Sequence, residues 1–404
     1  MQETWRWFGP QDRIQLSEIR QTGARGIVNA LHEIPYGEVW TVEAITARKA
    51  LIAEDPGLGL EWQVVESLPV HERIKLGDGD LEPLFETYRQ SLRNLAACGI
   101  RTVCYNFMPL LDWTRTELAA PVVGGGTSLR FNMHEYVAFD VFMLEREGAA
   151  DDVAPQTLAR AKAWFEASMP ADRERLLAAI NAGLPGAYAR YDVAGLREIL
   201  GRYAGITRDD VRANYRRFLE AVVPVAEEAC MRLCVHPDDP PRPLFGLPRV
   251  VSNAEDIAFV LDAVPSPANG LTLCSGSLGA NPANDVPAIA ARFADKIHFA
   301  HLRNVAKDAD GSFEEADHLA GDTDMVALVR VLMAEERRRR AEGRADAEIP
   351  MRPDHGHELL SDIGRGTHPG YPVIGRMRGL AELRGVMAAV ATLDGDAAAH
   401  RVPA

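Results

Sequence analysis

Short apolar runs alternate with longer stretches of helical periodicity along most of the chain. Runs of this length and composition are typical of strands, and the alternation is typical of parallel βα units. Several runs are apolar on both faces, as parallel strands buried on both sides should be. The predicted strands are Thr4–Phe8, Gly26–Leu31, Glu61–Ser67, Arg101–Phe107, Met231–Pro237, Gly270–Ser275, Lys296–Arg303 and Ile349–Asp354.

The stretches between these runs predict helices. In Leu81–Cys98, apolar residues recur at helical spacing, and Gly99 follows as a common helix stop. The other predicted helices are Thr41–Glu54, Asp209–Cys230, Ala254–Ala263, Asp324–Arg340 and Ile374–Val390. Eight strands that alternate with helices can close a (β/α)8 barrel. We therefore expect an α/β fold with one such barrel over residues 1–404.

The segment 108–208 does not fit a minimal barrel. Its patterns predict helices over Pro155–Ser168 and Asp172–Ala182. We interpret it as a largely helical insertion after the fourth strand, because no Ser/Gly-rich linker separates it as a domain. The three glycines at 124–126 predict a turn; no Lys-Ser/Thr follows them, so they are not expected to bind phosphate.

Composition and charge narrow the function classes. Of 404 residues, 47% are hydrophobic and 25% charged, which is an ordinary globular balance. The formal net charge of -14 argues against a nucleic-acid partner, and the basic run Arg337–Arg340 is expected on a solvated helix face. We see no signal peptide or membrane span, and five scattered cysteines indicate no disulfide framework. A cytoplasmic protein is expected, forming a homo-oligomer for which the insertion offers an interface.

Four residues with metal-binding side chains lie at the ends of four predicted strands: His236, Cys274, His301 and Asp354. In a parallel barrel, the carboxyl ends of all strands meet at one mouth, so these side chains should converge. Any one of them alone would more often be structural, but four at successive strand ends predict a metal site. The mixed N/S/O donor set is compatible with zinc, ferrous iron, cobalt or manganese.

Further polar residues should face the same mouth. His355, directly after Asp354, is a candidate proton carrier, and His357 is a candidate for the same role or for supporting a ligand. Arg303 and Arg352 have the planar fork that binds carboxylates. Candidate substrate-binding residues, besides these arginines, are His32, Glu66, Asn106 and Asp238. A metal, cationic forks and hydroxyl-binding groups together suggest a small polyhydroxy acid as substrate.

Long segments of the chain resemble the mannonate dehydratases of hexuronate degradation. The resemblance is carried by Thr-Trp-Arg-Trp-Phe-Gly-Pro at 4–10, Ile-Arg-Thr-Val-Cys-Tyr-Asn-Phe-Met-Pro at 100–109 and Leu-Asp-Trp-Thr-Arg-Thr at 111–116. It continues in Val-His-Pro-Asp-Asp-Pro-Pro-Arg-Pro at 235–243, His-Leu-Arg at 301–303 and Met-Arg-Pro-Asp-His-Gly-His at 351–357. It implies a xylose-isomerase-like barrel that dehydrates D-mannonate to 2-keto-3-deoxy-D-gluconate with Mn(II) or Fe(II).

The resemblance also implies roles for particular residues. The ligands of that family fall on His236, Cys274, His301 and Asp354, and its two proton-transfer residues fall on His355 and Tyr371. Which of these two is the base remains open at this point, as does the choice between the two metals. By its residue type alone, Tyr371 would more often be a packed aromatic.

Three alternatives remain from the residues themselves. An aldose–ketose isomerase on the same fold would be expected to have more carboxylates, bridging two metals. A zinc phosphodiesterase of barrel type would have to bind nucleic acid with an acidic surface. A sugar-acid binder without activity would show ligand-dependent thermal stabilisation without consumption of the sugar acid.

Overall fold

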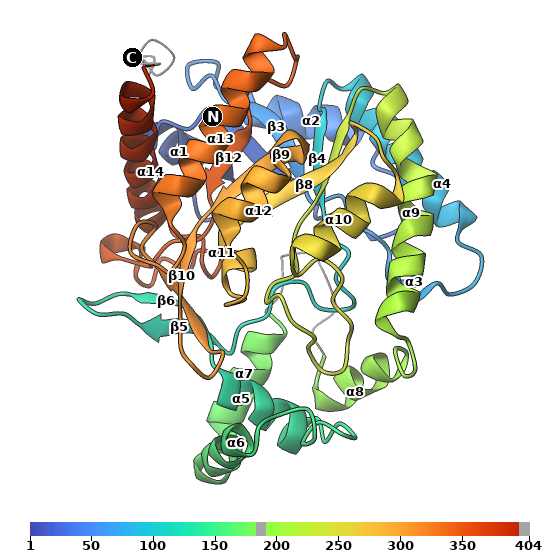
Figure 1. Ribbon diagram of the computed structural model, residues 1–404, viewed down its shortest axis with the longest axis vertical. Coiled ribbons are helices and arrows are strands. Elements are labelled where there is room, and N and C mark those ends of the chain that lie inside the picture. The colour runs from blue at the N-terminus through green and yellow to red at the C-terminus, as the bar shows by residue number, and fades with distance from the viewer. Residues whose placement is uncertain (183–190, 396–404) are drawn as a thin grey trace.

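A closed barrel of eight parallel strands forms the centre of the computed structural model, which describes residues 1–182 and 191–395 (Figure 1). Around the barrel the strands follow the order β1-β12-β9-β8-β7-β4-β3-β2. Their bounds are β1 Gln2–Arg6, β2 Gly26–Asn29, β3 Glu61–Glu66, β4 Thr102–Tyr105, β7 Arg232–Val235, β8 Asn269–Cys274, β9 Ile297–Leu302 and β12 Pro350–Pro353. Each lies within or overlaps one of the eight predicted runs, so the barrel prediction is confirmed.

Helices follow the strands and cover the barrel from outside (Figure 1). They are α1 Leu16–Gln21, α2 Val42–Ile52, α3 Glu72–Leu76, α4 Glu82–Ala97, α9 Arg208–Glu228, α10 Ala254–Ala263, α11 Ser275–Gly279, α12 Val286–Arg292, α13 Met325–Ala341 and α14 Val373–Leu393. In α4 the buried face includes Tyr88, Leu92 and Leu95, which lie three or four residues apart. The six helices predicted in this layer are all present, with ends shifted by three residues or fewer.

The hydrophobic core has one main layer between the strands and the surrounding helices. A smaller cluster fills the barrel interior and consists of Val28, Val64, Cys104, Cys234 and Phe299. Cys104 and Cys234 are paired across β4 and β7, and neither side chain is exposed. Both cysteines are therefore packing residues below the mouth of the barrel.

The insertion after β4 begins with a hairpin that the hydrophobic pattern did not predict. The hairpin consists of β5 Glu117–Pro121 and β6 Thr127–Phe131, and Gly124–Gly126 form its turn with positive φ. It pairs with β10 Asn304–Lys307 and β11 Phe313–Ala316, in the order β10-β11-β6-β5. The second sheet lies beside the barrel mouth and therefore joins the insertion to the loop after β9 (Figure 1).

The rest of the insertion is helical, as predicted. Its described helices are α5 Met133–Ala138, a π-helical turn Phe139–Met143, α6 Pro155–Ala167, α7 Pro170–Ile180 and α8 Val193–Gly201. They enclose a second hydrophobic cluster that includes Phe131, Phe139, Leu176 and Phe245. The remaining short turns are 3-10 helices at Ala294–Lys296 and Leu360–Asp362.

One surface prediction was partly wrong. Arg339, in the basic run of α13, is 1% exposed and donates to the carbonyls of Ala294 and Ile297. It is also paired with Glu335 at 2.7 Å, so its charge is balanced where it is buried. The other three arginines of the run remain partly exposed, as expected. Nowhere in the described chain is a helix both long and apolar enough to cross a membrane.

Candidate active site

The four predicted metal ligands lie together at the carboxyl ends of four neighbouring strands. The donor atoms of His236, Cys274 and His301 all lie within 4.8 Å of one another. Asp354 closes the group, with Oδ2 3.6 Å from Cys274 Sγ and Oδ1 3.9 Å from His301 Nδ1. Parallel pairing sets this level, because Cys274 is in register with His301 across β8 and β9. The convergence predicted from strand ends is therefore present.

The hydrogen bonds of the two histidines leave room for a cation between them. His236 Nδ1 lies 2.7 Å from the carbonyl of Pro237, which only accepts, so its proton is on Nδ1 and Nε2 has a lone pair. His301 Nε2 lies 3.3 Å from the carboxylate of Glu66, and Arg352 Nη2, which can only donate, lies 3.4 Å from Nδ1, so the lone pair of His301 is on Nδ1. The two lone pairs face each other at 3.2 Å. A metal ion between nitrogens of this kind would remove their repulsion, so the residues fit a bound cation.

The sulfur of Cys274 accepts two hydrogen bonds and, as a thiol, donates one to Asp354 Oδ2 at 3.6 Å. Ser277 donates to Sγ through its backbone N–H at 3.4 Å and its hydroxyl at 3.0 Å. Gly276, between them, has no room for a side chain, since a Cβ there would lie 1.9 Å from Nε of Arg303. The short helix α11 thus holds the sulfur toward the group while Arg303 passes behind it. A sulfur that accepts hydrogen bonds is suited to bind a metal as a thiolate.

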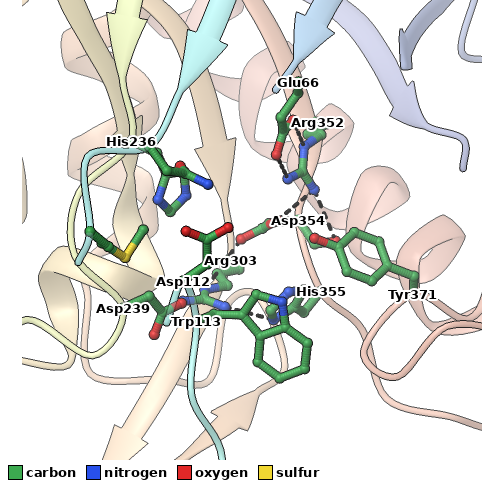
Figure 2. A pocket seen from close by; sticks show the side chains of 12 residues that line it. Glu66, Asp112, Trp113, His236, Asp239, Arg303, Arg352, Asp354, His355 and Tyr371 are labelled. Atoms are coloured by element: carbon green, nitrogen blue, oxygen red, sulfur yellow. Dashed lines mark hydrogen bonds and ion pairs between the residues drawn. The ribbon is translucent and has the colours of Figure 1, made fainter. Parts of the chain in front are cut away.

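Arg352 connects two carboxylates of the site. Its guanidinium forms a two-pronged pair with Glu66, at 3.1 and 2.8 Å, and lies 2.5 Å from Asp354 Oδ1 (Figure 2). Burial alone would raise the pKa of Glu66 and of Asp354. Arg352 and the neighbouring His301 act with further cationic groups to outweigh burial in both and hold each pKa well below its usual range. Both acids are therefore ionised, and Arg352 fixes the orientation of the proposed ligand Asp354.

A second network surrounds Arg303 and includes two residues that sequence reasoning missed, Asp239 and Glu315. Arg303 lies 2.5 Å from Asp239, 3.1 Å from Glu315 and 2.6 Å from Nδ1 of His355. Arg115 pairs with the same two acids, at 2.8 and 2.9 Å. All five side chains are at least 96% buried. The network links the strand end after β9 to the second sheet, because Glu315 belongs to β11.

The charges of this network determine its ionisation. Burial would raise the pKa of Asp239, but Arg115 and Arg303 hold it well below its usual range. For Glu315, Arg303 and His355 outweigh the same effect of burial and lower the pKa to about 2. Glu315 is therefore an anion at neutral pH, and its Oε1 lies 3.0 Å from His355 Nδ1. This oxygen is placed to accept a hydrogen bond from an N–H group of the His355 ring.

Tyr371 lies beside His355, with ring centroids 4.9 Å apart in an edge-on arrangement. It is 3% exposed and follows Gly370, which has a φ of +82° and lies in a turn that a side chain would strain. Burial raises the pKa of Tyr371, and Arg352 only partly offsets this. The phenol therefore keeps its proton at neutral pH. In Figure 2, Tyr371 and His355 project from the same side of the site.

These groups line one cavity at the mouth of the barrel. Its lining residues are Glu66, Asn106, Met108, Asp112, Trp113, His236, Asp239, Arg303, Arg352, Asp354, His355 and Tyr371 (Figure 2). Both predicted arginines are present, but each is already paired with carboxylates of the chain. Asn106 and Glu66 are present as predicted, although Glu66 is bound to Arg352 and His301.

Three residues singled out from the sequence lie elsewhere. Asp238 is turned away from the cavity and accepts from Val251 N–H and the hydroxyl of Ser252. His32 lies against Arg6, at 2.9 Å, and lines a neighbouring depression instead. His357 contacts the backbone carbonyl of Glu315 at 2.9 Å, which fits a supporting role. Their placement lends no support to direct contacts of Asp238 or His32 with a substrate.

Asp112 and Trp113 also line the cavity, and the predicted residue set did not include them. Both belong to the segment that connects β4 to the hairpin of the insertion. No strand-end rule applies to this segment, because it is a loop. The only available signal was their place in the quoted run at 111–116, which carried the resemblance without assigning a role to either residue.

Comparison with known proteins agrees over nearly the whole chain. A family model described as D-mannonate dehydratase (UxuA) matches residues 1–395. A mannonate dehydratase of Chromohalobacter salexigens is 56% identical over 394 residues, which cover 97% of this chain and 100% of the relative. One of Marinomonas sp. is 52% identical over 96% and 98%. The crystal structure of mannonate dehydratase from Streptococcus suis serotype 2 superimposes with a TM-score of 0.75 at 34% identity, covering 98% of this chain and 95% of that one.

Proposed function

The chain belongs to the D-mannonate dehydratase family of hydro-lyases, and we propose that it dehydrates D-mannonate to 2-keto-3-deoxy-D-gluconate with Mn(II) or Fe(II). One observation carries the proposal. His236 and Asp354 of the four-donor group line the same cavity as the buried His–Tyr pair, with Cys274 and His301 directly behind them. Breaking a carbon–oxygen bond next to an acidified C–H needs both kinds of group.

The metal would be held by His236, Cys274, His301 and Asp354. Of the two metals proposed, both accept imidazole and carboxylate ligands, and the donor set does not separate them. A divalent ion at this position supplies positive charge that stabilises the negative charge developing on the substrate carboxylate when the neighbouring proton leaves. Arg352 and Glu66 support the site from behind, by fixing Asp354 and His301.

We assign the base to His355 and the acid to Tyr371. Since burial raises the pKa of Tyr371, its phenol has a proton to give at neutral pH. The proton on C2 is then removed by Nε2 of His355, provided that Nδ1–H donates to Glu315 at 3.0 Å. Arg303 Nη1, which can only donate, lies 2.6 Å from Nδ1 and favours a lone pair there, so the assignment depends on the ionised Glu315 holding the proton on Nδ1.

The bonds and protons of the reaction balance. His355 takes the C2 proton, and the electron pair of that C–H bond forms a double bond between C2 and C3. The C3–O bond breaks, and Tyr371 protonates the departing hydroxyl group so that it leaves as water. The resulting enol converts to the 2-keto acid by proton transfer, so no redox cofactor takes part. His355 and Tyr371 then exchange protons with water to restore their starting states.

The test is turnover by a single purified sample before and after metal removal. The protein is stripped with a chelator, and formation of 2-keto-3-deoxy-D-gluconate from D-mannonate is followed with and without added Mn(II). We expect product only in the metal-loaded sample. Absence of product from a sample with one equivalent of bound metal would reject the proposed reaction, and equal turnover by the stripped sample would reject the metal.

A further inference from the structure

Asp112 is a buried carboxylate in the cavity that the proposed chemistry does not use. Its side chain is 6% exposed, and Oδ1 has no hydrogen-bond partner among the residues that the structure describes. Asn106 donates a hydrogen bond to the same carboxyl group. A buried carboxylate oxygen without a donor is unfavourable, so Oδ1 is positioned for a donor that is not part of the chain.

The other acids that line the cavity differ from Asp112 in this respect. Glu66, Asp239 and Asp354 each form an ion pair with an arginine at 2.8 Å or less. Within the described ranges, no arginine forms an ion pair with Asp112, and burial outweighs the attraction of Lys75 and Arg249 and raises the pKa of its carboxyl group. Its free oxygen is therefore available to a ligand, whereas the oxygens of the other three acids already hold the site together.

Asp112 lies in the segment after β4 and reaches the cavity beside the ends of β2 and β3. It also lines an adjoining depression with Leu31, Tyr36 and Ser67, which follow β2 and β3, whereas the proposed ligands lie at the ends of β7, β8, β9 and β12 on the other side of the barrel. Within the described chain, no hydrogen bond or ion pair joins it to His236, Cys274 or His301. In Figure 2 it projects into the cavity from the segment after β4. A substrate whose carboxylate is at the metal would extend its other end toward this side.

A second polar group of the same segment also lacks a partner. The indole N–H of Trp113 is buried and has no acceptor among the described residues. The Trp113 ring lines the cavity next to His355, with centroids 6.2 Å apart. Consecutive residues thus offer an acceptor and a donor, and a hydroxyl group can bind both kinds.

We propose that Asp112 binds a hydroxyl group at the end of the sugar acid remote from its carboxylate, and thereby selects six-carbon acids over shorter ones. The inference rests on the proposed function and names a specificity residue within the same site. Asp112 is not assigned a proton transfer. Its free oxygen accepts a hydrogen bond from the substrate, and Asn106 holds the carboxyl group in position.

The test uses two acids that differ only at the remote end. D-lyxonate has the same configuration as D-mannonate at C2, C3 and C4 but is one carbon shorter. In Asp112→Asn the amide oxygen can keep the hydrogen bond from Asn106, while the NH2 group replaces the free acceptor oxygen. We expect the preference for D-mannonate, as the ratio of the two kcat/KM values, to fall about tenfold or more. The kcat/KM for D-mannonate should fall, whereas the kcat/KM for D-lyxonate should stay nearly unchanged.

The outcomes are separable. A variant that slows both acids equally, with an unchanged ratio, would overturn the role of Asp112. A wild-type protein that converts neither acid would overturn the proposed function itself. Asp151→Asn, at an exposed acid of the insertion, is the matched control and should keep the wild-type ratio. Asp112→Ala, which removes the acceptor without adding a donor, is measured as well and should shift the ratio in the same direction if Asp112→Asn fails to fold.

Discussion

Glu315→Gln tests whether a buried charge orients the proposed base. Glu315 is 3% exposed, and its Oε1 lies 2.9 Å from Arg115, 3.1 Å from Arg303 and 3.0 Å from His355. Arg303 and His355 overcome the effect of burial and lower the pKa of Glu315 from 4.5 to about 2. At about 1.4 kcal/mol per pH unit, the ionised form is stabilised by about 3 kcal/mol. This agrees with the 3–5 kcal/mol that breaking a buried ion pair costs.

The sign of the pH dependence follows from the lowered pKa. An acid whose pKa is lower in the folded state stabilises the fold fully above its unfolded pKa, and this contribution is lost as the pH falls toward the folded pKa. The wild type should therefore exceed Glu315→Gln in free energy of unfolding by about 3 kcal/mol at pH 7. The gap should narrow below pH 4.5, to about 2 kcal/mol at pH 3.5.

Urea unfolding of the metal-free proteins measures this gap without a contribution from metal release. Glu314→Gln is the matched control, because Glu314 lies on the opposite face of β11 and pairs with the partly exposed Arg130. That variant should lose less than about 1 kcal/mol. A Glu315→Gln variant as stable as this control, or a gap that does not change with pH, would refute the electrostatic argument. We also expect kcat to fall at least about tenfold.

Two further predictions concern the residues assigned to metal and protons. Cys274→Ser should bind Mn(II) at least about tenfold more weakly while its thermal unfolding midpoint in the metal-free state stays close to wild type; unchanged metal affinity would remove Cys274 from the site. In D2O, Tyr371→Phe should still exchange the C2 proton of D-mannonate without forming product, whereas His355→Asn should lose both exchange and turnover yet retain metal. The opposite pattern would reverse the assignment of base and acid.

The strand ends were predictable because one geometric rule covers them. Side chains at the carboxyl ends of parallel barrel strands must converge, so His236, Cys274, His301 and Asp354 could be grouped without knowing any distance. The same rule brought Asn106 and Glu66 to the cavity. The rule does not predict that Glu66 pairs with Arg352 and His301 and not with a substrate, because the partner of a charged side chain depends on its rotamer.

The residues that were missed or misplaced lie where no such rule applies. Asp238 and Asp239 are neighbours in an extended segment, so their side chains point to opposite sides, and composition does not tell which faces the cavity. Glu315 belongs to the short polar strand Phe313–Ala316, whose pairing partner β6 lies about 180 residues earlier in the chain. Pairing over that distance leaves no local periodic signal. The second sheet, and with it the partner of His355, was therefore invisible from the sequence pattern.

Among the ion-paired groups around Arg303 and Arg352, carboxylates outnumber guanidinium groups. For every acid of the set, arginine and histidine neighbours together outweigh burial and hold the pKa below its usual range, so all are ionised at neutral pH. The set has four carboxylates and three guanidinium groups: Glu66, Asp239, Glu315 and Asp354, and Arg115, Arg303 and Arg352. A sugar acid would add another negative charge to this excess. A bound divalent cation would make the net charge of the set positive, and the site would then attract the carboxylate of the sugar acid.

Metal binding should therefore precede substrate binding. Titration calorimetry with the His355→Asn variant, which we expect not to consume D-mannonate, measures the affinity for the acid with and without Mn(II). Because linkage is reciprocal, the factor by which Mn(II) tightens D-mannonate binding must equal the factor by which D-mannonate tightens Mn(II) binding. We expect a factor of about 100 or more, at the upper end of coupling between two sites, since the charges are close and buried. Equal affinity of the stripped and loaded proteins for D-mannonate would mean that another group neutralises its carboxylate, and Arg6, which has two buried nitrogens without partners in the described chain, would be the first to examine.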